Sequence, residues 1–184
     1  MVEVASGDGS AFAKLFDRHS KAVARFCFRY VGEKARAEEL AQEVFVKLYR
    51  SAGSYTPAAK FRTYLFRVAA NHCLNEIRRP QYRSVHEALD DHASLPADAS
   101  SSPSASVEGM EVEQALRTAL AAMSDRERAA FTMCRFEGLA YREIAFALQS
   151  SEAAVKSLIH RATLQVAKKI EELHAGVHPE RSRA

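Results

Sequence analysis

One segment with very few large apolar residues divides the chain into two halves. The stretch His86–Met110 is rich in Ser, Ala, Asp and Pro and contains no aromatic residue. Such a stretch cannot bury enough apolar surface to offset the entropy that ordering costs. An unstructured loop of that length is also unusual inside one compact domain. The 184 residues are therefore expected to form two small domains, residues 1–82 and 111–184, joined by a flexible linker over residues 83–110.

The charges differ between these parts of the chain. The total is only +3, but residues 1–82 carry a net +6, residues 83–113 a net −6 and residues 114–184 a net +3. Two basic domains on an acidic tether indicate a nucleic-acid partner. The sequence has no run of about 18 apolar residues and no secretory signal, so a cytoplasmic location without membrane insertion is expected.

Apolar residues recur at steps of three and four in both halves, which predicts buried helix faces; they include Phe26, Leu40, Val44 and Leu48 in the first half and Val155, Ile159 and Ala162 in the second. Strand patterns are absent, so the fold class is expected to be all-α. The first half should hold three helices. The first lies between Ser10, its expected N-cap, and Gly32, which ends it; the others cover residues 34–50 and 61–79.

The second half is expected to contain a helix-turn-helix. A helix begins near Glu111, and the capping box formed by Ser124 and Glu127 starts another. Two further helices, over residues 141–148 and 152–173, are joined by a three-residue turn, and a disordered tail follows from about residue 175. This spacing fits a DNA-binding helix-turn-helix, or equally an ordinary pair of packed helices.

Enzymatic chemistry is not expected. The three cysteines lie far apart in the sequence, the histidines are scattered, and phosphate-binding loops and nucleophile motifs are absent. We therefore expect no catalytic residues, no metal and no cofactor.

Motifs in both halves resemble those of the extracytoplasmic-function (ECF, group four) sigma factors of bacterial RNA polymerase. In the first half these are AEELAQEVF at residues 37–45, FRTYL at 61–65 and VAAN at 68–71, followed by Arg78 and Arg79. In the second half, residues 116–157 resemble the C-terminal domain of that family. The resemblance implies a region-2-like domain that binds core polymerase and melts the −10 element, and a region-4-like domain that reads the −35 element.

The resemblance also implies which residues of the first domain act. The clamp helices of the largest polymerase subunit should meet one helix face formed by Glu39, Gln42 and Glu43. Aromatic rings and amides capture unstacked bases, while basic side chains contact phosphates. The expected −10 set is Tyr55, Lys60, Phe61, Arg62, Tyr64, Arg67, Asn71, Asn75, Arg78 and Arg79, of which Phe61 and Tyr64 could instead be core residues.

In the second domain the last helix should enter the major groove with its N-terminal residues. The expected −35 set is Ser151, Glu152, Ala153, Lys156, Ser157, His160 and Arg161. Three departures from the family pattern predict weaker or altered −35 recognition. Gln149 replaces the turn glycine, Ala140 replaces a Ser/Thr cap, and Leu158 and Thr163 replace two arginines.

The sequence is thus interpreted as an alternative sigma factor. Its expected partners are core polymerase (clamp helices and the flap of the second largest subunit), promoter DNA and an anti-sigma factor. The alternative is a stand-alone helix-turn-helix regulator whose N-terminal domain binds a partner. Such a regulator would not need the face formed by Glu39, Gln42 and Glu43.

Overall fold

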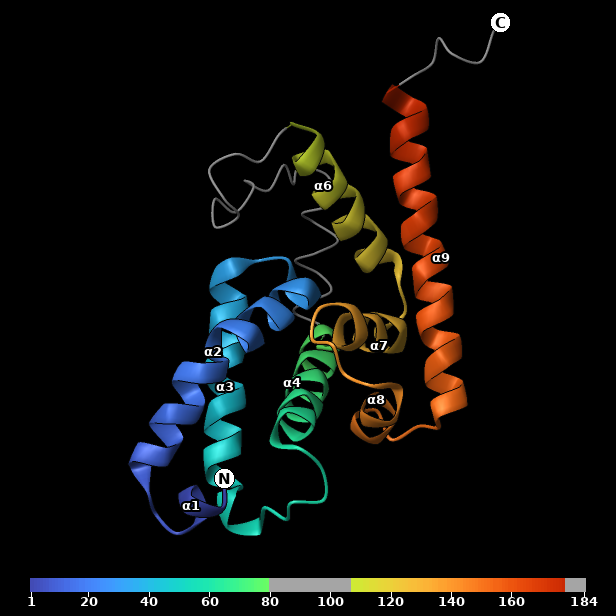
Figure 1. Ribbon diagram of the computed structural model, residues 1–184. Helices are drawn as coiled ribbons and strands as arrows, with labels where there is room; N and C mark the ends of the chain where they lie inside the picture. The colour runs from blue at the N-terminus through green and yellow to red at the C-terminus, as the bar shows by residue number, and fades with distance from the viewer. Residues whose placement is uncertain (80–106, 178–184) are drawn as a thin grey trace, which may run out of the picture.

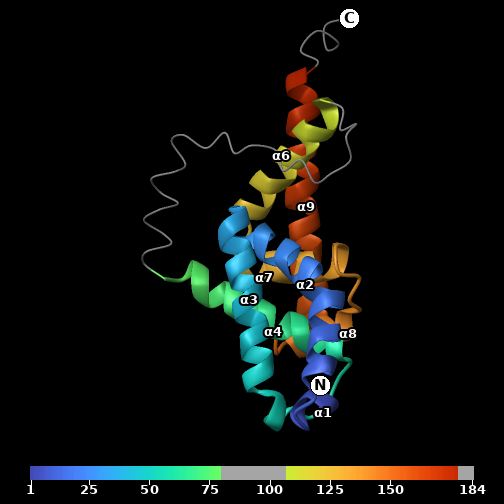
Figure 2. The same ribbon diagram turned by 90° about the vertical axis from the view of Figure 1, so that its left-hand side faces the viewer.

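The computed structural model describes residues 1–79 and 107–177, and in these residues every regular element is a helix (Figures 1 and 2). Residues 80–106, which include most of the linker expected over residues 83–110, and residues 178–184 lie outside the described part. The all-α expectation is confirmed.

The first helical unit is built from α2 (Gly9–Val31), α3 (Lys34–Arg50) and α4 (Phe61–Ile77). The unit also contains two short elements that the sequence analysis did not predict. They are α1 (Val2–Ala5), before α2, and a 3₁₀ turn, η1 (Ala52–Ser54), after α3. The fully buried side chains include Phe26 of α2 with Leu40, Val44 and Leu48 of α3. These are the positions that the helical spacing assigned to the interior.

The N-cap of α2 corrects the sequence prediction. Asp8, not Ser10, caps the helix, because the Asp8 carboxylate accepts from the backbone N–H groups of Ser10 (2.8 Å) and Ala11 (3.1 Å). The Ser10 hydroxyl also donates to it at 2.7 Å. An ionised cap forms stronger bonds at the positive end of a helix than a hydroxyl does. The expected end of α2 is confirmed, since Gly32 is left-handed with φ 70°.

The second unit contains α6 (Val107–Ala122), α7 (Asp125–Arg135), α8 (Tyr141–Ala147) and α9 (Glu152–Val177). Helix α6 begins four residues before the expected Glu111, and α9 continues past residue 173. The two pack along each other and extend beyond the rest of the molecule (Figure 1). Leu120, Met123, Phe131 and Ala162 form a small core among α6, α7 and α9.

The helix-turn-helix forms from α8 and α9 as predicted. Gln149 in the turn has φ 48°, a left-handed conformation that glycine adopts more easily. The Ser151 hydroxyl accepts from the N–H of Ala154 at 3.1 Å and so caps α9. Helix α8 begins after Ala140, whose side chain cannot cap it, and only Glu143 compensates by accepting from the Ala140 N–H at 2.9 Å.

The two units pack against each other, an arrangement that the sequence did not reveal. Helix α4 packs on α2 and α3 of its own unit and on α7 and α8 of the other (Figure 1). One apolar core runs through both units and includes Leu65 and Phe66 of α4, Met133 of α7 and Ile144 of α8. The helix-turn-helix therefore lies against the helix that carries most of the expected −10 residues.

We expect Gln149→Gly to stabilise the protein by about 0.5–1 kcal/mol. Relief of left-handed strain, about 1–2 kcal/mol, should exceed the extra unfolded-state entropy of glycine. Gly138→Ala is the matched control, because Gly138 has φ 62° and an added Cβ meets nothing within 4 Å. It should lose about 1 kcal/mol. Urea unfolding measures both changes, and a loss of stability in Gln149→Gly would show that the turn is not strained.

Candidate functional site

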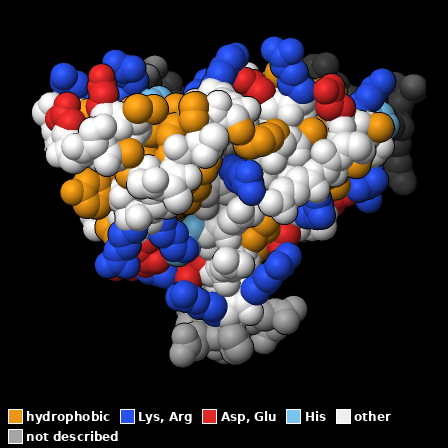
Figure 3. All heavy atoms as spheres, turned by 90° about the horizontal axis from the view of Figure 1, so that it is seen from below, with side chains coloured by type: hydrophobic (Ala, Val, Ile, Leu, Met, Phe, Trp, Pro, Cys, Tyr) orange, Lys and Arg blue, Asp and Glu red, His pale blue; other side chains and the backbone are white. Residues whose placement is uncertain are grey.

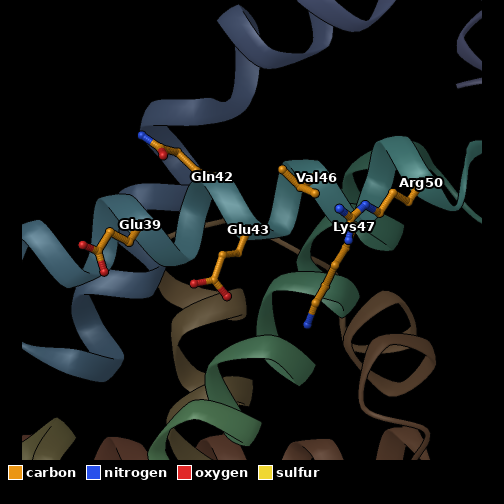
Figure 4. A pocket seen from close by; sticks show the side chains of 6 residues that line it. All are labelled: Glu39, Gln42, Glu43, Val46, Lys47 and Arg50. Carbon is orange, nitrogen blue, oxygen red and sulfur yellow. The ribbon is translucent and has the colours of Figure 1, made fainter.

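The outer face of α3 carries a shallow hollow of about 420 Å³. Its six lining residues are ordered by charge along the helix (Figure 4). They are Glu39, Gln42, Glu43, Val46, Lys47 and Arg50. The three residues expected to contact polymerase thus lie together at the acidic end of one surface. The basic end, formed by Lys47 and Arg50, was missed in the sequence because basic residues near a helix C-terminus are common on solvated faces.

Neither carboxylate in this hollow is free. Arg36 donates from Nη1 to Glu39 at 2.8 Å and to Glu43 at 3.4 Å, and His72 Nε2 lies 2.7 Å from the second oxygen of Glu43. The Glu39 side chain is 62% exposed and that of Glu43 43%. The sequence predicted purely outward carboxylates; the structure shows that Glu43 also bonds a buried group of α4.

The aromatic residues expected at the −10 element divide into two groups. The rings of Tyr55 and Tyr64 meet edge to face with centroids 5.0 Å apart, and the Tyr64 hydroxyl lies 3.2 Å from Ser51 Oγ. Both tyrosines are partly exposed. Phe61 lies apart from this pair, with its ring centroid 5.4 Å from that of His19. Both Phe61 and Tyr64 are partly buried and pack against the main apolar core, so the alternative interpretation of either ring as a core residue stays open.

Four of the expected phosphate-contacting residues are engaged by the second unit. Lys60 pairs with Glu143 at 3.2 Å, Arg62 with Glu137 at 3.1 Å and Arg78 with Asp125 at 3.6 Å. The guanidinium of Arg67 lies 5.3 Å from the ring centroid of Phe146. Arg79, just after the end of α4, pairs with Glu76 of that helix at 2.9 Å, and the side chains of Asn71 and Asn75 are exposed.

The second unit's side of this contact could not be found in the sequence. The Glu137 side chain is only 5% exposed, and it lies 75 positions from its partner Arg62. The hydrogen bond from the Ala140 N–H and the positive charge of Lys60 lower the pKa of Glu143, so it is ionised at neutral pH. Further contacts join the units: Arg29 stacks on Phe136 at 3.8 Å, and Arg128 donates to the carbonyl of Tyr30 at 3.1 Å.

These pairings leave the basic residues in small groups. In the face seen in Figure 3, Lys and Arg side chains are spread among acidic and hydrophobic ones and form no single continuous basic patch. The packed arrangement therefore does not offer this face as an uninterrupted surface for a phosphate backbone.

The seven residues expected at the −35 element all lie exposed over the first three turns of α9, while Val155, Ile159 and Ala162 face the interior. Arg161 is held by Glu127 of α7 at 2.6 Å. Burial would raise the pKa of Glu127, but the hydrogen bonds from Arg161 and Ser124 outweigh it and lower that pKa. Leu158 is buried, so the residue that replaces a family arginine packs in the core.

Within residues 1–79 and 107–177, no group of three or more His, Cys, Asp or Glu side chains could hold a metal ion. None of the helices within these ranges is both long enough and apolar enough to cross a membrane.

Known proteins resemble this chain along most of its length. Residues 15–83 match the family model of Sigma-70 region 2, and residues 113–166 match that of Sigma-70, region 4. The RNA polymerase sigma-H factor of Pseudomonas aeruginosa is 31% identical over 180 residues, which cover 92% of this chain and 91% of that protein. The ECF RNA polymerase sigma factor SigE of Mycolicibacterium smegmatis is 31% identical over 165 residues, 88% of this chain but 63% of SigE.

A solved structure shares the fold. The sigma factor RpoE, crystallised with the anti-sigma factor NepR from Bartonella quintana, superposes with a TM-score of 0.68 at 18% identity. The match covers 88% of this chain and 97% of that one. Two family models in the expected order and a full-length relative above 30% identity lead to one conclusion: the chain belongs to the extracytoplasmic-function family of RNA polymerase sigma factors.

Proposed function

We propose that this chain acts in the cytoplasm as an alternative sigma factor without catalytic activity of its own. It binds core polymerase through the α3 hollow, opens the −10 element with α4 and the Tyr55–Tyr64 pair, and reads the −35 element with the N-terminal turns of α9. The observation that carries this proposal is the exposed N-terminal face of α9. A capped helix with outward polar residues in its first turns suits entry into a DNA major groove.

We further propose that promoter binding requires the two units to separate. While Lys60, Arg62 and Arg78 pair with Glu143, Glu137 and Asp125, the neighbouring carboxylates neutralise their charge and weaken any contact with a phosphate. Separation also exposes the apolar core shared by α4, α7 and α8, so contacts with polymerase have to replace both the ion pairs and this packing. An anti-sigma factor, as in the RpoE complex, is a proposed further partner.

The alternative function, a stand-alone helix-turn-helix regulator, differs in one testable respect. Such a protein would bind duplex DNA without polymerase. The hollow on α3, with its ordered acidic and basic ends, favours a macromolecular partner at this face and supports the sigma-factor proposal.

Glu39→Lys should lower the affinity for core polymerase at least tenfold, because it places a cation where a basic partner surface is expected. The fold should persist, since the change removes only an exposed ion pair. Glu38→Lys is the control, because Glu38 is exposed on the same helix but does not line the hollow. Fluorescence titration of core polymerase measures both affinities; equal affinities for the two variants would contradict this role for the hollow.

Glu137→Gln should increase binding of the free protein to a single-stranded −10 oligonucleotide by roughly three- to tenfold, because a neutral amide holds Arg62 less tightly than a carboxylate. The control Glu137→Gln/Arg62→Ala weakens the same contact but removes the phosphate-binding cation, so it should gain little. Fluorescence anisotropy measures the affinities, and X-ray scattering reports whether the units separate. If the affinity of Glu137→Gln stays at the wild-type value, the interdomain contact does not limit DNA binding.

Lys156→Ala should weaken holoenzyme binding to a −35 half-site by roughly 1–3 kcal/mol if its contact is to a base edge. Lys168→Ala, an equal charge change on the exposed later part of α9, should leave this binding almost unchanged. Competition with duplexes altered only at −35 separates base contacts from phosphate contacts. Equal losses for both variants would mean that α9 contributes general charge and not sequence recognition.

A further inference from the structure

A histidine buried on α4 holds two side chains of the α3 hollow. The His72 side chain is 4% exposed. Its Nδ1 lies 2.6 Å from Lys47 Nζ and its Nε2 lies 2.7 Å from Glu43 Oε2. An ammonium group can only donate, so Nδ1 must accept from Lys47, and Nε2 must carry the proton that it donates to Glu43. The two neighbours therefore fix the tautomer of the ring.

This arrangement requires a neutral ring. Burial lowers the pKa of His72 and the positive charge of Lys47 lowers it further, while Glu43 acts in the opposite direction. The ring is consequently uncharged at neutral pH. It then serves as a rigid bridge between a cation and an anion that lie one turn apart on α3.

Glu76 lies one turn along α4 from His72. It positions the Glu39 carboxylate indirectly, through Arg36 of α3. Its side chain is 8% exposed, and its Oε1 accepts from both Arg36 Nε (3.0 Å) and Arg36 Nη2 (2.5 Å). Arg36, oriented in this way, donates to Glu39 and Glu43. Burial alone would lower the pKa of Arg36, but the hydrogen bonds to Glu39 and Glu76 raise it above its usual value. Two buried side chains of α4 thus orient both carboxylates on the face of α3.

We propose that His72 is a positioning residue for polymerase binding: it fixes the Glu43 carboxylate and the Lys47 ammonium in the hollow before the partner arrives. This inference rests on the proposed function of the hollow. A long side chain that is already fixed loses less rotamer freedom on binding, and preorganisation of this kind increases affinity. His72 adjoins the exposed Asn71 on the same helix, so the bridge joins the polymerase-binding face to the helix proposed to read the −10 element.

The test is a double-mutant cycle on the affinity of the full chain for core polymerase. His72→Leu removes the bridge and Glu43→Gln removes the charge that it positions. Each should lower the affinity roughly tenfold, the value of one hydrogen bond to a charged group. The double variant should bind no more weakly than either single variant, because both act through the same carboxylate.

Two controls separate positioning from general damage to the fold. His72→Gln keeps an amide donor and an acceptor, so it should restore affinity to within about threefold of the wild type. Cys73→Ala removes a fully buried side chain next to His72 without touching the hollow, so it should lower the melting temperature but not the affinity. Circular dichroism confirms that every variant is folded at the assay temperature.

The outcomes distinguish this inference from the proposed function. If Glu43→Gln leaves the affinity unchanged, the proposed role of Glu43 in polymerase binding is wrong, and so is the positioning role proposed for His72. If Glu43→Gln weakens binding but the effects of the two single variants add in the double variant, Glu43 keeps its role and the positioning role of His72 is overturned. Equal losses in His72→Leu and Cys73→Ala would also overturn it, since they would indicate a purely structural effect.

Discussion

Helix α4 is the element on which the whole arrangement depends. One side of it packs on α2 and α3, and another packs on α7 and α8, so a single apolar core passes through both units. Burial of apolar surface supplies most of the free energy of such a contact. The ion pairs of Lys60 and Arg78 lie at its exposed edge, where they fix the orientation more than they strengthen the contact. Arg62 pairs with the buried Glu137.

The same helix serves two proposed surfaces with different sides. Its buried polar residues His72 and Glu76 bond side chains of α3, while its basic residues point toward the second unit. Both sets therefore belong to one helix, α4, although one contacts α3 and the other contacts the second unit. The bridge is made of charged and hydrogen-bonded groups, which tolerate misplacement less well than apolar contacts do.

Helical spacing predicted the helices well because the buried face of an amphipathic helix appears in the sequence as apolar residues at steps of three and four. Leu40, Val44, Val155 and Ile159 are all buried as expected, and the left-handed turn at Gln149 follows from its place between two helices. The sequence did not identify the N-cap of α2 correctly, because two nearby residues can both cap a helix. Ser10 is a good cap, but Asp8, two positions earlier, takes that place with a charged oxygen. Helix α6 begins early, within a segment whose composition resembled a linker.

The sequence by itself determined the all-α class, the helix-turn-helix and the exposed residues of α9, because these depend on contacts a few positions apart. The tertiary structure alone decided which partners the charged residues bind. Arg62 and Glu137 are separated by 75 positions, and Glu43 and His72 by 29. The periodicity of a single helix cannot predict either pairing, because neither pair lies within one helix. Whether a basic residue is free for DNA or bound to a carboxylate depends on how helices pack, which is set by the summed burial of many side chains.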